Sequence, residues 1–169
     1  MLLDGVFIKA NKLETIISDI LDATEMDTSK FTLSPGLTQD LQIEDLLDSV
    51  VESHQLDVET SGLSLRYQKP EKPLPKIKGS RKHLDQVFNN LIDNAIKYTP
   101  AKNEKTGAKG KVLISATNDD KFIIVKVSDN GIGIPKGEIK NLCEKFARAS
   151  NAKEMYADGT GLGLCPASI

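Results

Sequence analysis

The order of helices and strands that the sequence predicts from residue 41 is typical of a two-layer α+β domain. A helix is followed by a strand, a second helix, a pair of strands, and two glycine-rich loops with a helix between them. The second of these helices has one apolar side, and the paired strands are rich in β-branched residues. Each element therefore has a face to bury against the other layer.

Length and composition restrict the class of protein. A chain of 169 residues predicts one globular domain plus an appendage, and 39% apolar residues can form a core. The net charge of −2 and the lack of a basic stripe argue against nucleic acid as a partner. The two cysteines, Cys143 and Cys165, have neither metal-site spacing nor a disulfide framework, which indicates a reducing compartment. Without an apolar run of about 18 residues, we expect a soluble, cytoplasmic chain.

The N-terminal part predicts a separate helix over residues 6–26, "VFIKANKLETIISDILDATEM". Its apolar residues recur at three- and four-residue steps. They are Leu13, Ile16, Ile17, Ile20 and Leu21. A helix of this kind suits either a helical bundle or an ordinary core, and the pattern leaves both open. "TLSPG" at 32–36 is turn chemistry that ends it.

The remaining elements follow from periodicity and turn residues. We expect a helix from about Asp40 to Leu56, a strand at 63–67 and a helix from about Ser80 to Tyr98. The segment 69–79 is rich in proline, and 101–111 is a polar loop. Residues 111–131 predict a hairpin that turns at "TNDDK". A last helix is expected near Lys136–Arg148, between the glycine clusters "DNGIGIP" and "DGTGLGL".

The helix at 80–98 includes residues 89–98 of the stretch "NNLIDNAIKYTP", whose polar side carries amides where a merely solvated helix would carry Glu and Lys. Leu84, Phe88, Leu91, Ile92 and Ala95 project to one side, and Gln86, Asn90, Asp93, Asn94 and Lys97 to the other. Asn90, Asn94 and Lys97 stand at i, i+4 and i+7. They offer oxygens to a hard cation and donors to phosphate. Taken alone, this helix also fits a solvated face.

The two glycine clusters add a second and a third signal. A buried Asp129 at the end of its strand would accept a hydrogen bond from the amine of adenine and repel the carbonyl of guanine. Gly131 and Gly133 would permit positive φ and close approach to a ligand. In "DGTGLGL" successive backbone amides can hold phosphate oxygens, although no Walker A lysine follows. Each cluster alone is equally a simple turn or a flexible loop.

Together and in this order, the motifs resemble the ATP-binding domain of sensor histidine kinases, in the superfamily that includes DNA gyrase, Hsp-type chaperones and mismatch-repair ATPases. "NNLIDNAIKYTP" is similar to the N box, "DNGIGIP" to the G1 box, "EKFARA" to the F box and "GTGLGL" to the G2 box. "NKLETIISDILDATEMDTSKFTL" is similar to the second helix of the dimerisation hairpin. The resemblance covers nearly the whole chain and implies a mixed sheet.

The resemblance implies ATP and Mg²⁺ as cofactors. Asn94 would ligate the metal, while Asn90 and Lys97 would act in catalysis at the metal and phosphate site. Tyr98 would border the adenine, and Asp129 would bind its amine. The other positions expected around the nucleotide belong to the G1 box, the lid and the G2 box. They are Gly131, Ile132, Gly133, Ile134, Phe146, Arg148, Gly159, Thr160, Gly161, Leu162, Gly163 and Leu164.

The implied organisation is part of a dimerisation hairpin at 1–30, a linker at 31–40 and the ATP-binding domain at 41–169. The implied reaction is transfer of the γ-phosphoryl group to a histidine, in a full-length kinase that forms homodimers through the N-terminal helix and serves a response-regulator receiver domain. Sensor kinases of this family are often anchored in a membrane, so the resemblance allows an anchor in the full-length kinase. Hydrolytic relatives place Glu at the position of Asn90, and an amide cannot accept the proton of an attacking water. Asp93 is a possible weaker base.

The sequence departs from the family pattern at both ends. Neither His54 nor His83 has the setting of a phosphoacceptor, so the acceptor histidine is expected to be absent. After the G2 box the sequence ends at "CPASI", where kinases continue with a helix and further strands. We therefore expect a chain truncated at both ends. A nucleotide-binding or dimerising kinase remnant with a regulatory role stays open as an alternative.

Overall fold

The computed structural model describes residues 38–103, 107–142, 147–156 and 161, which belong to two compact units. One unit contains the described residues up to Gly133, and the other contains those from Ile134 on. Each is treated by itself below. The helix predicted at 6–26 and the turn at 32–36 lie outside the described residues.

A three-stranded mixed sheet forms one layer of the first unit, in the order β2-β4-β5. β2 (Ser64–Gln68) runs parallel to β4 (Lys111–Asn118), and β4 runs antiparallel to β5 (Ile123–Asp129). The predicted hairpin is thus present, with Val112 opposite Asp129 at its open end. Its turn is fixed by Asp119, whose Oδ1 accepts the backbone N–H groups of Lys121 and Phe122.

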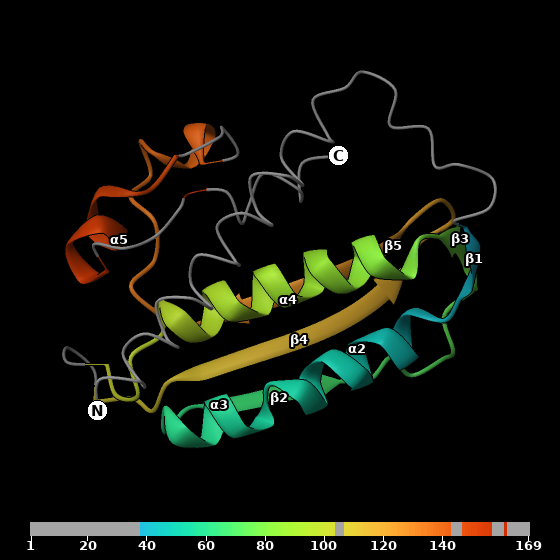
Figure 1. Ribbon diagram of the computed structural model, residues 1–169, viewed down its shortest axis with the longest axis horizontal. Helices are drawn as coiled ribbons and strands as arrows, with labels where there is room; N and C mark the ends of the chain where they lie inside the picture. The colour runs from blue at the N-terminus through green and yellow to red at the C-terminus, as the bar shows by residue number, and fades with distance from the viewer. Residues whose placement is uncertain (1–37, 104–106, 143–146, 157–160, 162–169) are drawn as a thin grey trace, which may run out of the picture. The chain divides into compact units, whose positions relative to one another are not determined.

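Helices cover one face of this sheet, as Figure 1 shows for α2 and α4 beside β4. The helices are α2 (Ile43–Ser53), α3 (Gln55–Thr60) and α4 (Arg81–Lys97). Along β4, Val112, Ile114 and Ala116 are buried, while the residues between them are exposed or half-buried. This alternation is typical of a sheet with one covered face. The predicted α+β fold class is confirmed.

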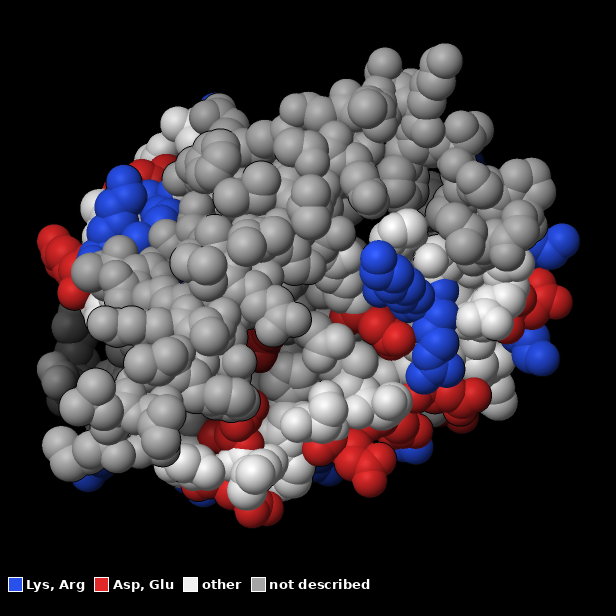
Figure 2. Space-filling view, viewed as in Figure 1, with Lys and Arg blue, Asp and Glu red and all other residues white. Residues whose placement is uncertain are grey.

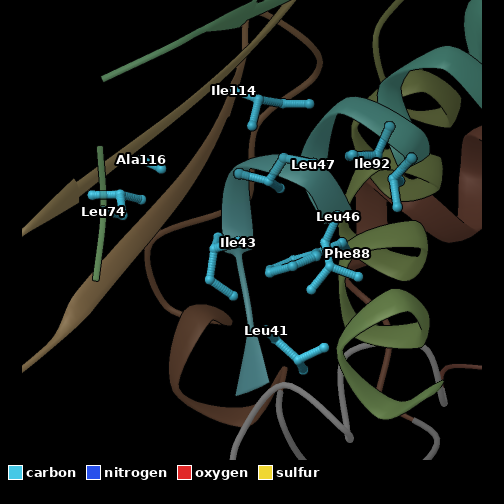
Figure 3. Packing of buried hydrophobic residues seen from close by; sticks show 10 residues of the cluster. Leu41, Ile43, Leu46, Leu47, Leu74, Phe88, Ile92, Ile114 and Ala116 are labelled. Atoms are coloured by element: carbon cyan, nitrogen blue, oxygen red, sulfur yellow. The ribbon is translucent and has the colours of Figure 1, made fainter. Parts of the chain in front are cut away.

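The core lies between the two helices and the sheet. In Figure 3, Phe88 and Ile92 of α4 lie beside Leu46 of α2, and Leu47 lies toward Ile114 of the sheet. Leu47, Ile92 and Ile114 are each 0% exposed. Completely buried side chains of this size contribute the most to the hydrophobic free energy of folding. The helix carrying the N-box motif is therefore held to α2 and the sheet by its apolar side.

The helix that was predicted from about Asp40 to Leu56 does not begin at Asp40, so this predicted boundary is wrong. Asp40 lies in a short strand, β1 (Gln39–Leu41), which pairs antiparallel with β3 (Ile77–Gly79). The helix begins at Ile43 instead. At its first turn, the Glu44 carboxylate accepts the backbone N–H of Leu74 at 2.7 Å, and the side chain of Gln42 donates to the carbonyl of Leu74 at 2.8 Å. These bonds fix the proline-rich segment against the start of α2.

In the second unit, the predicted helix over Lys136–Arg148 is wrong for the residues that the structure describes. A single 3₁₀ turn, η1 (Ile139–Asn141), takes its place, and Ala149 has extended dihedral angles. A six-residue helix that sequence analysis did not predict, α5 (Ser150–Met155), follows. Among the described residues, no helix is long and apolar enough to cross a membrane.

Candidate functional site

The amide-bearing helix of the sequence is α4, and its predicted apolar side is the buried one. Phe88, Ile92 and Ala95 are buried. On the polar side, Asn90, Asn94 and Lys97 are half-buried along successive turns. A wholly solvated face would leave such side chains exposed, so their partial burial favours the interpretation that they line a site.

Asp93 does not belong to this polar group, although the helical projection placed it there. Its side chain is 64% exposed, and its Oδ1 lies 2.9 Å from Nε2 of His54, at the junction of α2 and α3. His54 itself is buried, with 6% exposure. The hydrogen bond to Asp93 raises the pKa of His54, burial opposes this rise, and the Val50 carbonyl adds to it. Sequence spacing carried no signal for this pair, because its members are 39 residues apart.

The end of α4 is joined to the loop after β5 through the backbone. The carbonyl of Tyr98 accepts the N–H of Ile132 at 3.0 Å. A Cβ atom built on Gly131 would lie 2.2 Å from that same carbonyl oxygen, so only glycine fits there. Lys97 lies over the Tyr98 ring, with its Nζ 5.2 Å from the centroid. The N-box and G1-box motifs therefore form one connected structure.

The two glycines of the G1 box serve different needs, which the sequence analysis did not separate. Gly133 has φ of +66°, in the left-handed region that was predicted. Gly131 is needed for a close approach, but the group that it approaches is the Tyr98 carbonyl of the protein itself. The prediction of positive φ is therefore confirmed at Gly133 alone of the two.

Asp129 is exposed, so the expectation that it is buried was wrong. It is the last residue of β5, where the sheet ends, and its Oδ1 accepts the N–H of Gly131 at 2.9 Å. Asn130, which sequence analysis did not single out, fixes the same loop. Its Oδ1 accepts the N–H of Lys111 at 2.7 Å, and its Nδ2 donates to the carbonyl of Lys109 at 3.1 Å.

The remaining predicted site residues belong to the second unit. Ile134 is exposed, and Arg148 donates to the carbonyls of Ala152 and Tyr156. Gly161 has φ of +73°. Six predicted site residues lie outside the described part of the chain. They are Phe146, Gly159, Thr160, Leu162, Gly163 and Leu164.

Comparison with known proteins places this arrangement in a family. The family of histidine kinase-, DNA gyrase B- and HSP90-like ATPases matches residues 79–167, which is more than half of the chain. The chain belongs to this family. Within these ATPases it is similar to the adaptive-response sensory kinase SasA of Synechocystis, with 32% identity over 154 residues, covering 90% of this chain and 37% of SasA. It is also 28% identical to the phosphate regulon sensor protein PhoR of Pseudomonas aeruginosa, over 92% of this chain and 32% of PhoR.

Solved structures agree with the predicted resemblance to sensor histidine kinases. Full-length ShkA in complex with AMPPNP is 27% identical, with a TM-score of 0.74, over 92% of this chain and 30% of ShkA. The histidine kinase AdeS of Acinetobacter baumannii, at 20% identity, shares the fold with a TM-score of 0.72, over 98% of this chain and 69% of AdeS. The chain spans about a third of the length of SasA and PhoR.

Proposed function

We propose that this chain is the ATP-binding catalytic part of a two-component sensor histidine kinase. The observation that carries the proposal is the polar side of α4. Asn90, Asn94 and Lys97 are half-buried there, and the following Tyr98 is tied by its carbonyl to the Gly131–Ile132 turn. In the proposed reaction, the full-length kinase transfers the γ-phosphoryl group of ATP to a histidine and then to a response-regulator aspartate.

We assign the metal to Asn94. Among the described residues, no three or more His, Cys, Asp and Glu side chains are grouped as metal ligands. Mg²⁺ commonly takes one or two protein oxygens and completes its shell with water and substrate phosphates, so an amide oxygen beside a triphosphate fits it. When bound, the ion would neutralise charge on the transferring phosphoryl group. Asn90 would support this site, and Lys97 would donate to phosphate oxygens.

Asp129 is assigned to adenine recognition. A carboxylate accepts hydrogen bonds and cannot donate them, so it favours the exocyclic amine of adenine over the carbonyl of guanine. The hydrogen bond from Gly131 to Oδ1 holds the carboxylate at the end of β5. Tyr98 and Ile132, joined through the backbone, would border the base.

The domain organisation that the sequence implies is also proposed. Residues 1–30 would belong to a dimerisation hairpin, 31–40 to a linker and 41–169 to the ATP-binding domain. The acceptor histidine would come from an added or partner hairpin. His54 is buried and hydrogen-bonded to Asp93, and is therefore inaccessible to phosphoryl transfer. Homodimerisation and response-regulator binding would take place in the full-length kinase. Water attack would be poorly catalysed, since Asn90 is no base.

Calorimetry with a non-hydrolysable ATP analogue tests the proposal. We expect binding that requires Mg²⁺ and that Asp129→Asn weakens at least about tenfold, because the amide places a donor where the amine needs an acceptor. Asp120→Asn, at an exposed position in the β4–β5 turn, is the matched control and should bind like the unsubstituted chain. Phosphorylation of a hairpin domain with its histidine, supplied separately, then tests catalysis. A folded chain that binds no analogue would contradict the proposal.

A further inference from the structure

His54 lies between two oxygen atoms that its ring contacts from opposite sides. Nε2 is 2.9 Å from Oδ1 of Asp93 on α4, and Nδ1 is 2.8 Å from the carbonyl oxygen of Val50, one turn earlier in α2. The hydroxyl of Ser53 lies 2.8 Å from the same carbonyl and 3.2 Å from Nδ1. A hydroxyl that donates to Val50 can only accept from Nδ1. Both ring nitrogens therefore face acceptors.

A ring with both nitrogens facing acceptors has to donate from both, which only the imidazolium form can do. His54 ends α2 and begins α3, so the dipoles of the two helices oppose each other at its ring. The charged side chains around the ring favour the cation. The charged groups that act on it are both acidic, namely Asp93 from α4 and Asp57 from α3. The raised pKa of His54 agrees with this geometry.

Asp93 immediately precedes Asn94, the residue assigned to the metal. A bound triphosphate carries several negative charges, so an uncompensated carboxylate one residue from its metal ligand would repel it. The neighbouring surface adds to this repulsion: acidic side chains gather over α2 and α3 along the lower edge of Figure 2, and Asp45, Glu52, Asp57 and Glu59 are exposed there. A protonated His54, hydrogen-bonded to Asp93, lowers this local negative potential.

We propose that His54 is a positioning residue of the nucleotide site, which acts through Asp93 by holding its carboxylate toward the α2–α3 junction and offsetting its charge beside the bound triphosphate. The inference rests on the proposed function, because it concerns binding at Asn94. It predicts that His54 matters for the phosphates of the nucleotide and not for its adenosine part. A role confined to stability would not make that distinction.

The test compares two probes, a non-hydrolysable ATP analogue with Mg²⁺ and adenosine, by calorimetry at low salt and pH 6.5. His54→Gln keeps a donor for Asp93 but loses the charge, so the analogue should bind about fivefold more weakly while adenosine binds within about twofold of the unsubstituted chain. Raising the salt from about 0.05 to about 0.5 M should reduce the difference, since screening weakens the repulsion. Asp120→Asn, which changes an exposed acid in the β4–β5 turn, is the control and should leave the ratio of the two affinities unchanged.

Removing both charges should restore binding. In His54→Gln/Asp93→Asn, an amide pair replaces the ion pair, and analogue affinity should return to within about twofold of the unsubstituted chain. If His54→Gln does not fold, as judged by circular dichroism, His54→Asn replaces it in both comparisons.

Three outcomes would overturn the inference. If His54→Gln lost affinity equally for the analogue and for adenosine, the role of His54 would be structural alone. If His54→Gln bound both probes as tightly as the unsubstituted chain does, His54 would have no role in binding. A double variant as weak as the single one would exclude charge compensation. If the unsubstituted chain binds neither probe, the proposed function itself fails. This result differs from the other three, because in each of them the unsubstituted chain binds the analogue.

Discussion

The two units of the chain are held together in different ways. In the first, a mixed sheet and two helices enclose a core whose largest side chains are completely buried. In the described residues of the second, Ala149 is the one buried apolar side chain, and polar contacts hold the segment. The Glu138 carboxylate accepts the backbone N–H and the hydroxyl of Ser150, each at 2.7 Å, and Arg148 donates to the carbonyls of Ala152 within α5 and of Tyr156 just after it.

The predicted nucleotide-binding residues accordingly fall into a packed group in the first unit and a polar group in the second. The N-box and G1-box residues are positioned by the buried side chains of α4 and by Gly131, which tolerates no Cβ. The segment that contains Arg148 rests on a few hydrogen bonds between partly exposed groups. Segments with few buried apolar contacts open at low free-energy cost, as lids of active sites do. Substitutions in the first unit should therefore have global effects, and those in the second should have local ones.

The largest effect is expected for Gly131→Ala. The new methyl group would lie 2.2 Å from the carbonyl oxygen of Tyr98, so either the G1 loop or the end of α4 must move. We expect a loss of about 4 kcal/mol in the free energy of unfolding and loss of ATP-analogue binding. Gly137→Ala is the matched control from the second unit, because a Cβ there meets nothing within 4 Å. Urea unfolding and calorimetry measure both, and equal effects would contradict the comparison.

A smaller global effect is expected for Ile92→Ala on α4. Ile92 is 0% exposed within the core, so truncation removes buried methylene groups and leaves a cavity. The expected cost is about 3 kcal/mol in the free energy of unfolding. Ile139→Ala removes the same atoms at a position of the second unit that is 53% exposed, and it should change stability by less than about 0.5 kcal/mol. Urea denaturation measures both variants. A cost at Ile139 matching that at Ile92 would mean that the second unit depends on apolar packing as much as the first does.

The first unit was largely predictable from sequence because its elements carry long-period signals. The apolar stripe of α4 and the β-branched strands around "TNDDK" each extend over several residues, and the structure has both elements. β1 and β3 contain three residues each, too few for an alternation to be distinguished from a helical turn. For this reason Asp40 was assigned to the helix. The pairing of these strands depends on partners almost 40 residues away.

The second unit was less predictable because polar contacts, unlike apolar periodicity, leave no regular pattern. The predicted helix over Lys136–Arg148 is replaced by a 3₁₀ turn in its described part. Glu138 instead bonds to Ser150, twelve residues later. Among the candidate site residues, the shared half-buried side of α4 that carries Asn90, Asn94 and Lys97 followed from helical spacing. The exposure of Asp129 and the diversion of Asp93 to His54 did not, since both depend on tertiary contacts.

The contact between His54 and Asp93 makes the stability of the first unit depend on pH. The hydrogen bond to Asp93 raises the pKa of His54 above its ordinary value of 6.5, so the folded state binds this proton more tightly than the unfolded state. The resulting stabilisation is fully present below pH 6.5 and is lost as the pH rises through the folded-state pKa. Urea unfolding of the chain and of His54→Gln should therefore differ most below pH 6.5 and converge once the pH exceeds the folded-state pKa of His54. A difference that is constant or grows with pH would contradict the ion pair.

The smallest global effect is expected where the polar contacts of the second unit are removed. Ser150→Ala deletes the hydroxyl that donates to Glu138, and Glu138→Gln weakens both bonds because a neutral amide oxygen is a poorer acceptor than a carboxylate. Amide hydrogen exchange should quicken at Ser150 and along α5, while the melting temperature stays within about 1 °C, since the buried core cluster contains no residue of this segment. Glu154→Gln, on the exposed surface of α5, is the control and should change neither quantity. If Ser150→Ala lowered the melting temperature as far as Ile92→Ala does, the segment would unfold together with the sheet and its helices, and its polar contacts would be part of one cooperative structure.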